Sequence, residues 1–393
     1  MKRRARLVVR LTARGLWVTA LVSLAACAVP AQSRPAAAAN APAHAAPAPT
    51  EPPPAPPAPM RVPPTRPEPA VLWKSTKLRE VDYVDLHEVA RNFGLKAAWV
   101  KGDTGMTLSE GKTVRCLFET RQKDFYFDGL RIFLGAPALA HKATLWVSKL
   151  DVIKIIAPLF RPGAHVAAMP AGEPRLVVID AGHGGIDPGT QNAKLGLNEK
   201  TSTLDVAQRL AKLLQLRGWK VVMVRDRDIE LSKDKKTDLL MRNELANRSN
   251  ADVYVSVHFN SAVPTVAGVE TYSLAPQFML SAGDEQGDDM TKVAYPSNRL
   301  DYANLLLGEK MHRAMVAGLK TPDRGYKHAR QAVLRMLECP GVLVECAYLS
   351  NDGEARRVAT PEFRQQIAEA IATGLQDYAT ALAGLRPAPP PAK

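Results

Sequence analysis

Residues 176–189 read LVVIDAGHGGIDPG, and this stretch decides the fold. Four apolar residues and an aspartate form a strand that reads as fully buried, and a histidine surrounded by glycines follows at once. The glycines do not form a nucleotide-phosphate loop, because Asp187 stands where the third glycine of G-x-G-x-x-G belongs and no G-K-[ST] follows. Instead they let the backbone turn sharply and leave the imidazole unobstructed. The stretch therefore predicts a strand that delivers His183 to the end of a sheet.

Strand and helix patterns alternate from residue 175 onwards. Apolar strand-like runs at 175–180, 219–225, 252–258, 268–274 and 341–345 are interleaved with amphipathic helical runs at 203–218, 238–248, 299–318 and 362–378. Such alternation predicts an α/β domain over residues 172–385, built on a twisted, mostly parallel sheet with helices on both faces.

Polar side chains stand at the ends of three of these strands. His183 follows the first strand, His258 ends another and Glu345 ends a third. Alone, a histidine at a strand end is usually a satisfied hydrogen-bonding group, and a glutamate there is usually solvated. Ligands of open α/β sheets bind beyond the carboxyl ends of the strands, so three such residues at one rim indicate a site. Asp180 would either orient a ligand there or cap the loop.

Four short motifs give the site a family resemblance. They are H-G-G at 183–185, N-E-K at 198–200, S-x-H-x-N at 256–260 and E-x-x-x-x-S-N at 345–351. With them, residues 175–378 resemble the zinc-dependent N-acetylmuramoyl-L-alanine amidases of the amidase 3 family. The resemblance implies one Zn²⁺ per chain, held by His183, Glu199 and His258, with Glu345 as the catalytic residue. It also implies a peptidoglycan hydrolase that cleaves the amide between N-acetylmuramic acid and L-alanine.

The chemistry of these residue types agrees with that assignment. Two imidazoles and one carboxylate leave Zn²⁺ an open fourth position, which a catalytic zinc site needs and a structural one lacks. Glu345 would then exchange protons as general base and general acid. Two alternatives stay open: a catalytically inactive wall-binding or regulatory lipoprotein on the same fold, and a zinc peptidase that cuts stem-peptide bonds. The presence of all four residues weighs against the first.

The segment at 275–298 is rich in glycine and aspartate. In some relatives a segment at this place covers the site until a partner displaces it. No helical pattern in this chain requires that interpretation, so autoinhibition and a regulatory activator protein stay open.

The N-terminus carries export signals. Residues 1–26 combine a basic start with an apolar run too short to span a membrane, which is typical of a signal peptide. LAAC at 24–27 resembles the bacterial lipobox, which implies a lipid on Cys27 and a membrane anchor. We therefore expect an exported, periplasm-facing lipoprotein of the cell envelope. The alanine after Cys27 favours the outer membrane over the inner.

The next segment predicts a disordered linker. Residues 28–70 hold 15 of the 31 prolines, mixed with alanine, so we assign 27–70 to a linker that cannot bury a core. In polyproline II form, at about 3.1 Å per residue, it could reach on the order of 100 Å. Residues 386–393 form a tail of the same kind.

The charge balance does not indicate a polyanion partner. Of the net +13, the signal carries a large share, and residues 171–393 hold 28 basic and 27 acidic residues, a surplus of one. We therefore expect no nucleic-acid partner.

Residues 71–165 predict a small α+β domain, with helices at 83–94 and 148–160 around short strands. It loosely resembles the copper amine oxidase N-terminal-like module, which serves as a stalk in many envelope proteins. No disulfide framework is expected: if extended, the run from Cys339 to Cys346 holds the two about 23 Å apart.

Overall fold

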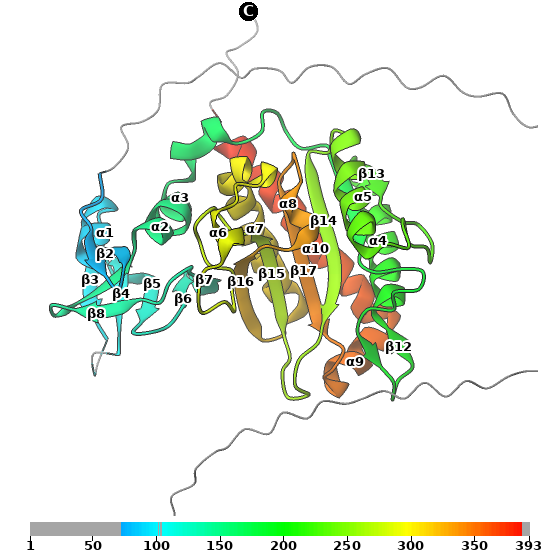
Figure 1. Cartoon of the computed structure of the whole chain (residues 1–393), viewed down its shortest axis with the longest axis horizontal. Helices are drawn as coiled ribbons and strands as arrows, with labels where there is room; N and C mark the ends of the chain where they lie inside the picture. The colour runs from blue at the N-terminus through cyan, green and yellow to red at the C-terminus, as the bar shows by residue number, and fades with distance from the viewer. Residues whose placement is uncertain (1–71, 101, 103, 387–393) are drawn as a thin grey trace, which may run out of the picture. The chain divides into compact units, whose positions relative to one another are not determined.

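The computed structural model describes residues 72–386, apart from 101 and 103 (Figure 1). The predicted signal peptide, the linker with Cys27 and the tail from residue 387 lie outside these residues. Within the described part of the chain, no helix has the length and apolar character needed to cross a bilayer. We refer to residues 72–171 as the N-terminal region and to residues 172–386 as the C-terminal region.

The N-terminal region is α+β, with short helices and a larger number of strands. Its elements are β1 (Thr76–Leu78), β2 (Val81–Asp85), α1 (Leu86–Asn92), β3 (Lys96–Trp99), β4 (Gly105–Glu110), β5 (Thr113–Glu119), β6 (Asp124–Phe127), β7 (Leu130–Phe133), β8 (Leu139–His141), β9 (Thr144–Ser148), α2 (Lys149–Asp151), η1 (Val152–Ile156), α3 (Ala157–Phe160) and η2 (Pro162–Ala168).

The C-terminal region alternates strands and helices, as the sequence predicts. Its strands are β10 (Leu176–Ala181), β11 (Gln191–Asn192), β12 (Leu197–Asn198), β13 (Lys220–Met223), β14 (Val253–Asn260), β15 (Val269–Leu274), β16 (Asp323–Ala329) and β17 (Gly341–Tyr348). Its helices are α4 (Glu199–Leu216), α5 (Lys235–Arg248), α6 (Asp289–Lys292), η3 (Pro296–Leu300), α7 (Asp301–Leu319), α8 (Ala332–Arg335), α9 (Asp352–Ala359) and α10 (Pro361–Gly384).

One sheet of eleven strands contains the main strands of both regions, in the order β13-β10-β14-β17-β15-β16-β7-β6-β5-β4-β3. Among the strands that the C-terminal region contributes to this sheet, every neighbouring pair is parallel except β15 and β17, so the predicted mostly parallel α/β sheet is confirmed. Strand β16 also pairs with β7, where Tyr326 stands opposite Ile132. The sheet therefore crosses the domain boundary predicted at residues 165–172, and that boundary stays a prediction.

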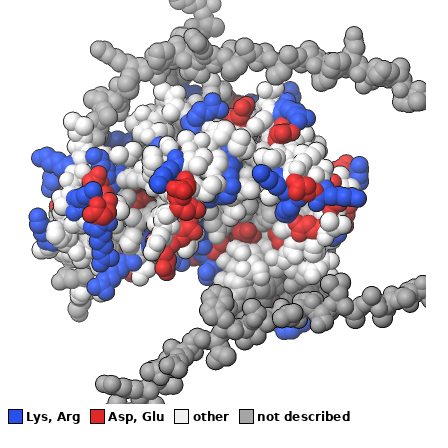
Figure 2. All heavy atoms as spheres, viewed as in Figure 1, with Lys and Arg blue, Asp and Glu red and all other residues white. Residues whose placement is uncertain are grey.

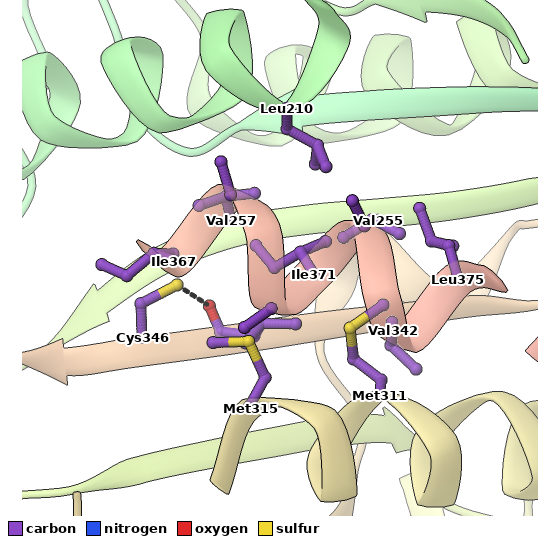
Figure 3. Close-up of a cluster of buried hydrophobic side chains, with 14 of the residues drawn as sticks. Leu210, Val255, Val257, Met311, Met315, Val342, Cys346, Ile367, Ile371 and Leu375 are labelled. Atoms are coloured by element: carbon purple, nitrogen blue, oxygen red, sulfur yellow. Dashed lines mark hydrogen bonds between the residues drawn. The ribbon is translucent and has the colours of Figure 1, made fainter. Parts of the chain in front are cut away.

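The main core lies on one face of this sheet, under α4, α7 and α10. Figure 3 shows Ile371 of α10 packed among side chains of α4, α7 and the strands. The labelled partners are Leu210 of α4, Met311 and Met315 of α7, Val255 and Val257 of β14, and Val342 of β17. The opposite face carries a smaller core with α5 and α8, built on Val178, Tyr254 and Leu343. Helices thus cover both faces, as predicted.

The alternation of strand β17 places its charged residue on the second face. Val344 and Cys346 are buried in the main core, so Glu345 between them points to the side of α5 and α8. Cys346, Cys339 and Cys116 are free thiols and all buried. Charged side chains of both signs are interspersed over most of the face that Figure 2 shows.

Candidate active site

The topology brings the predicted strand ends together. Strands β10, β14 and β17 are parallel neighbours, so their carboxyl ends share one rim of the sheet. In the register of β14 and β17, His258 stands directly opposite Glu345. His183 follows β10 at the same rim. The three residues that the strand-end rule singled out therefore lie in one place.

The glycine-rich loop brings His183 close to the other ligands. His183 itself has a left-handed backbone, with φ of 63°. Gly189 also has a positive φ, and a Cβ atom there would lie 2.5 Å from Glu199 Oε2 and 2.6 Å from the His183 ring. At Gly182 a Cβ atom would lie 2.3 Å from the His258 ring. The glycines are therefore required because the two imidazoles and the carboxylate pack directly against the loop backbone.

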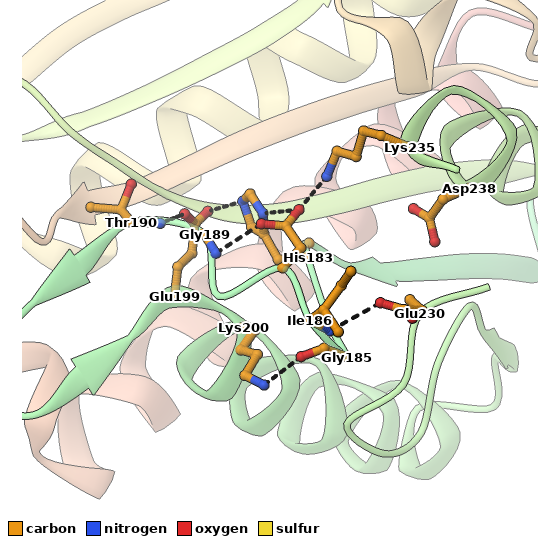
Figure 4. Close-up of polar contacts among 12 residues, drawn as sticks. His183, Gly185, Ile186, Gly189, Thr190, Glu199, Lys200, Glu230, Lys235 and Asp238 are labelled. Carbon is orange, nitrogen blue, oxygen red and sulfur yellow. Dashed lines mark hydrogen bonds and ion pairs between the residues drawn. The ribbon is translucent and has the colours of Figure 1, made fainter. Parts of the chain in front are cut away.

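Ligand atoms of His183, Glu199 and His258 meet at this loop. Figure 4 shows His183 and Glu199 side by side there. Glu199 Oε1 lies 3.1 Å from His183 Nε2 and 2.9 Å from His258 Nδ1. Each of the three residues offers one ligand atom, and these three atoms all lie within 4.8 Å of one another. They are close enough to hold a single metal ion. The structure thus brings His183, Glu199 and His258 together, including the glutamate that only the family motif had indicated.

Backbone donors hold Glu199 in place. As the first residue of α4, it accepts hydrogen bonds from the amides of Thr190, at 2.7 Å, and Phe259, at 3.0 Å. Burial alone would raise the pKa of Glu199, but its hydrogen bonds with His183 and His258 hold that pKa well below the ordinary value. The carboxylate is therefore ionised and preorganised as a ligand.

Asp187 orients His183 from the other side, a role that the sequence did not reveal. Its Oδ2 lies 2.9 Å from His183 Nδ1, and Lys235 of α5 pairs with the same carboxylate. Burial lowers the pKa of His183, but Glu199 and then Asp187 raise it above the ordinary value overall. A carboxylate on the second ring nitrogen is the usual way to fix the tautomer of a metal-binding histidine.

Two buried arginines fasten the backbone of the loop. Arg225 donates to the carbonyl oxygens of Ala181 at 2.8 Å, Gly182 at 2.9 Å and Lys200 at 2.7 Å. Burial, and then the charge of Arg242, lower its pKa. Arg242 donates to the carbonyl oxygen of His183 at 3.0 Å. The loop that carries His183 therefore has a fixed course.

Asp180 acts through Arg242. Its carboxylate lies 2.7 Å from Arg242 Nη1 and accepts hydrogen bonds from the hydroxyls of Tyr254 and Ser256 at 2.6 and 2.9 Å. These contacts account for the hydrogen bonds described for Asp180, so its link to His183 runs through the Arg242 guanidinium. Of the two roles that the sequence left open, bracing the loop fits these contacts.

Glu345 is the carboxyl group with the fewest partners at the site. Its Oε2 atom is buried and makes no hydrogen bond with any described residue. Burial raises the pKa of Glu345 well above the ordinary value, and the nearby carboxylates of Glu199 and Glu270 add to the rise. A buried polar atom without a partner costs about 1–3 kcal/mol, which points to a functional use.

The segment at 275–298 is anchored to β16 and the residue after it. Arg330 donates to the carbonyl oxygens of Pro276, Met279 and Thr291 at 3.3, 2.7 and 3.4 Å. The amide of Ala282 bonds to the carbonyl oxygen of His328 at 2.7 Å. No hydrogen bond between this segment and His183, Glu199, His258 or Glu345 occurs within the described residues.

The donor set suits a metal ion that keeps an open coordination position. Two imidazole nitrogens and one carboxylate oxygen are the ligands of many catalytic zinc sites. The orphaned Glu345 oxygen beside them can exchange protons with a substrate or with water. The arrangement can therefore hydrolyse a polar bond.

The comparison with protein families matches residues 177–377, just over half of the chain, to the Amidase_3 family, described as N-acetylmuramoyl-L-alanine amidase.

Individual relatives agree with the family match. An uncharacterized cell wall amidase of Bacillus anthracis is 32% identical over 52% of this chain and 36% of its own length. The N-acetylmuramoyl-L-alanine amidase AmiC of Escherichia coli is 26% identical over 75% of this chain and 80% of its own length. The solved structure of the amidase AmiC2 of Nostoc punctiforme is 32% identical, covers 54% of this chain and 99% of that chain, and superposes with a TM-score of 0.42. The matched part of the chain thus spans between about a third and four fifths of these curated relatives.

Proposed function

Because the chain belongs to the Amidase_3 family, a family of hydrolases, we propose that it cleaves the amide bond between N-acetylmuramic acid and L-alanine in peptidoglycan. The observation that carries the proposal is the convergence of His183, Glu199 and His258 beside Glu345, whose Oε2 atom is buried and has no partner among the described residues. We assign the three residues as ligands of one Zn²⁺ and Glu345 as the catalytic residue.

The donor set fits that metal. Glu199 is ionised, and its Oε1 atom already lies between two ring nitrogens, so the three donors need little rearrangement to accept a cation. Zinc held there would polarise the scissile carbonyl and lower the pKa of a bound water molecule. All further steps of the proposal belong to side chains of the chain itself.

Glu345 moves the proton. As a carboxylate it takes a proton from the attacking water, and as a carboxylic acid it delivers that proton to the nitrogen of the departing L-alanine. Burial raises the pKa of Glu345, which favours the protonated form that the second step needs. Asp187 keeps the His183 ring oriented, and Arg242 keeps the His183 carbonyl in place.

Digestion of purified cell wall by the full chain tests the proposal. We expect release of peptides with a free L-alanine amino terminus, and loss of that release when a chelator removes the metal. New amino termini at other stem-peptide positions would favour the zinc peptidase instead. Binding to wall without any new amino terminus would favour the inactive wall-binding alternative.

We also propose that a lipid on Cys27 anchors the enzyme in the envelope and that the proline-rich linker carries it to the wall. Support comes from the sequence at 24–27 and from the composition of residues 28–70. Cys27→Ser should release the protein from the membrane fraction, and a variant that still sediments with lipid would contradict the anchor.

A further inference from the structure

A second group of charged residues reaches the rim that carries the candidate active site. Strand β15 runs antiparallel to β17, and β16 runs parallel to β15, so both strands start at the rim where β10, β14 and β17 end. Glu270, near the start of β15, stands directly opposite Glu345. Directly paired residues of antiparallel strands have Cα atoms about 4.5–5.5 Å apart, so Glu270 and Glu345 are immediate neighbours.

Glu270 is buried and gathers donors around itself. Its Oε1 atom lies 2.5 Å from Lys327 Nζ and 3.2 Å from Arg324 Nε, and it accepts a 2.6 Å hydrogen bond from the Tyr348 hydroxyl. Its Oε2 atom accepts hydrogen bonds from Tyr272 at 2.7 Å and Asn260 at 2.9 Å. Burial alone would raise the pKa of Glu270, but Lys327 and the tyrosines lower it overall, so the group is a fixed anion.

A bulge in β16 brings both cations to this anion. Residues three apart in a regular strand face opposite sides of the sheet, so Arg324 and Lys327 could not otherwise share a partner. The register shifts here by one residue, because Val269 and Thr271 of β15 stand opposite Asp323 and Tyr326. Bulges of this kind commonly redirect side chains beside active sites. The bulge therefore places both Arg324 and Lys327 beside Glu270, where a regular strand would place only one of them.

The two cations differ in what they can still bind. Lys327 has a side chain that is 12% exposed and lies over the rings of Phe133 and Tyr272. Arg324 has a side chain that is 35% exposed. Its Nε atom bonds to Glu270 and to the Tyr348 hydroxyl, at 3.2 and 3.1 Å. Its two terminal nitrogens make no hydrogen bond with any described residue.

The charges leave a surplus at this place. Glu270 contributes one negative charge and Arg324 and Lys327 contribute two positive charges, so these three residues carry a net charge of +1, which remains while the neighbouring Glu345 is protonated. A guanidinium fixed through Nε, with terminal nitrogens that make no hydrogen bond to a described residue, matches the two oxygens of a carboxylate. Neutral carbonyl oxygens can also accept from such a fork, but charge-assisted hydrogen bonds are stronger, so the fork favours an anionic ligand.

We infer that Arg324 binds a carboxylate group of the stem peptide while the scissile amide lies at Glu345. The inference rests on the proposed function and extends it, because it makes the enzyme selective for stem peptides with free carboxylates over their neutral, amidated forms. Glu270 and Tyr348 position the Arg324 guanidinium, and the Arg324 terminal nitrogens contact the substrate.

A purely structural role for Arg324 predicts a different result. If the arginine only neutralises Glu270, its loss weakens the fold or the site equally for every substrate. If it binds a carboxylate, its loss weakens hydrolysis of the charged substrate and leaves the neutral one unaffected.

Steady-state kinetics with two soluble N-acetylmuramoyl peptides separate these possibilities. The peptides differ only in whether their carboxylates are free or amidated, and the proteins are wild type, Arg324→Gln and Arg209→Gln. Arg209 is the matched control, because it is a partly exposed arginine of α4, with a side chain that is 29% exposed and paired with Asp205. A charge-assisted hydrogen bond supports a preference of about 10- to 100-fold in kcat/KM, which Arg324→Gln should abolish and Arg209→Gln should keep.

Three results would overturn the inference: no preference in wild type, an unchanged preference in Arg324→Gln, or an equal loss on both peptides. If the Arg324→Gln variant does not fold, Arg324→Lys replaces it in the same kinetic comparison. It keeps the charge beside Glu270 but lacks the fork, so the preference should fall several-fold, and an unchanged preference counts against the inference. If wild type hydrolyses neither peptide, the proposed function fails. Equilibrium binding of the same two peptides then decides the inference, with tighter binding of the charged peptide expected only when Arg324 is present.

Discussion

At the scale of single residues, the pKa of each carboxyl group at the site depends on whether its surroundings compensate the charge. Glu199 is buried yet ionised, because two histidines and two backbone amides compensate its charge. Glu345 is half-buried nearby, and its buried Oε2 atom has no partner among the described residues, so burial of the carboxyl group raises its pKa instead. Two carboxyl groups a short distance apart thus differ in pKa because their surroundings differ, an arrangement that often separates a ligand from a proton-transfer group.

The raised pKa of Glu345 makes a prediction about stability in the metal-free protein. Below the ordinary pKa of a glutamate, near 4.3, the folded and unfolded states both hold the proton. As the pH rises above that value, the unfolded chain releases the proton while the folded protein keeps it, so the free energy of unfolding falls. Glu345→Gln removes this loss. In chelator, the variant should match wild type near pH 4 and exceed it by about 1–3 kcal/mol at neutral pH.

Denaturant unfolding at several pH values measures this difference. Glu338→Gln, at an exposed position just before the same strand, is the matched control. A Glu345→Gln variant that is less stable than wild type at neutral pH would show that the Glu345 carboxylate is compensated in the folded protein.

The residues of the site differ in how far the sequence could predict them. His183, His258 and Glu345 follow from a rule, because parallel strands end at one rim. Glu199 follows only from its motif, since nothing in the helical pattern of α4 distinguishes its first residue. Asp187 was noticed only as a break in a glycine pattern. Its contact with His183 depends on the course of the loop, which local sequence does not determine.

At the scale of elements, the loop between β10 and α4 matters most. It closes over the ligands, and its glycines leave no room for side chains. The long helices and periodic strands of the C-terminal region were predicted correctly, whereas β16 was not. The helix predicted at 83–94 begins later, at Leu86, because residues 83–85 belong to β2. Strand β16 reads DRGYKHA, in which charged residues and a glycine hide the alternation that marks a strand. Pairing with β15 on one side and β7 on the other supplies the stability that its composition lacks.

Gly189→Ala tests the loop against a closely matched control. Gly189 and Gly196 have nearly equal backbone angles, with φ of 64° and 62°, so alanine strains both by about 1–2 kcal/mol. Only at Gly189 would the added Cβ meet Glu199 and His183, because nothing lies within 4 Å at Gly196. We expect Gly189→Ala to lose bound zinc and Gly196→Ala to retain it. The backbone strain that alanine introduces should be similar in the two variants. Metal analysis of both purified variants gives the answer, and equal zinc content would contradict the proposed crowding.

At the scale of the whole described molecule, the two regions share a sheet and a core. Strand β7 pairs with β16, and Leu305 and Tyr326 of the C-terminal region pack in the core of the N-terminal region. The sequence predicted two domains from a change in pattern near residue 170. It could not predict this pairing, because contacts between distant strands leave no local signal.

The shared core predicts coupled unfolding. Ile132 is fully buried and lies opposite Tyr326 across the junction of the two regions. Ile132→Ala should cost about 2–5 kcal/mol and should lower the unfolding temperature of the C-terminal region as well. Val114→Ala, at an exposed position of the same region, is the control. Calorimetry should show one transition that shifts as a whole, whereas a shift confined to one of two transitions would support independent domains.

The central claim is that His183, Glu199 and His258 hold zinc while Glu345 transfers the proton. Zinc content and wall hydrolysis, measured together on Glu345→Gln, test it most directly. Glutamine keeps the volume of the side chain but cannot accept a proton, and general acid–base catalysis contributes about 10²–10⁴-fold to rates. We predict about one zinc per chain and a loss of hydrolysis of that size, whereas His258→Ala should lose the metal itself. Loss of zinc from Glu345→Gln, or hydrolysis close to that of wild type, would contradict the claim.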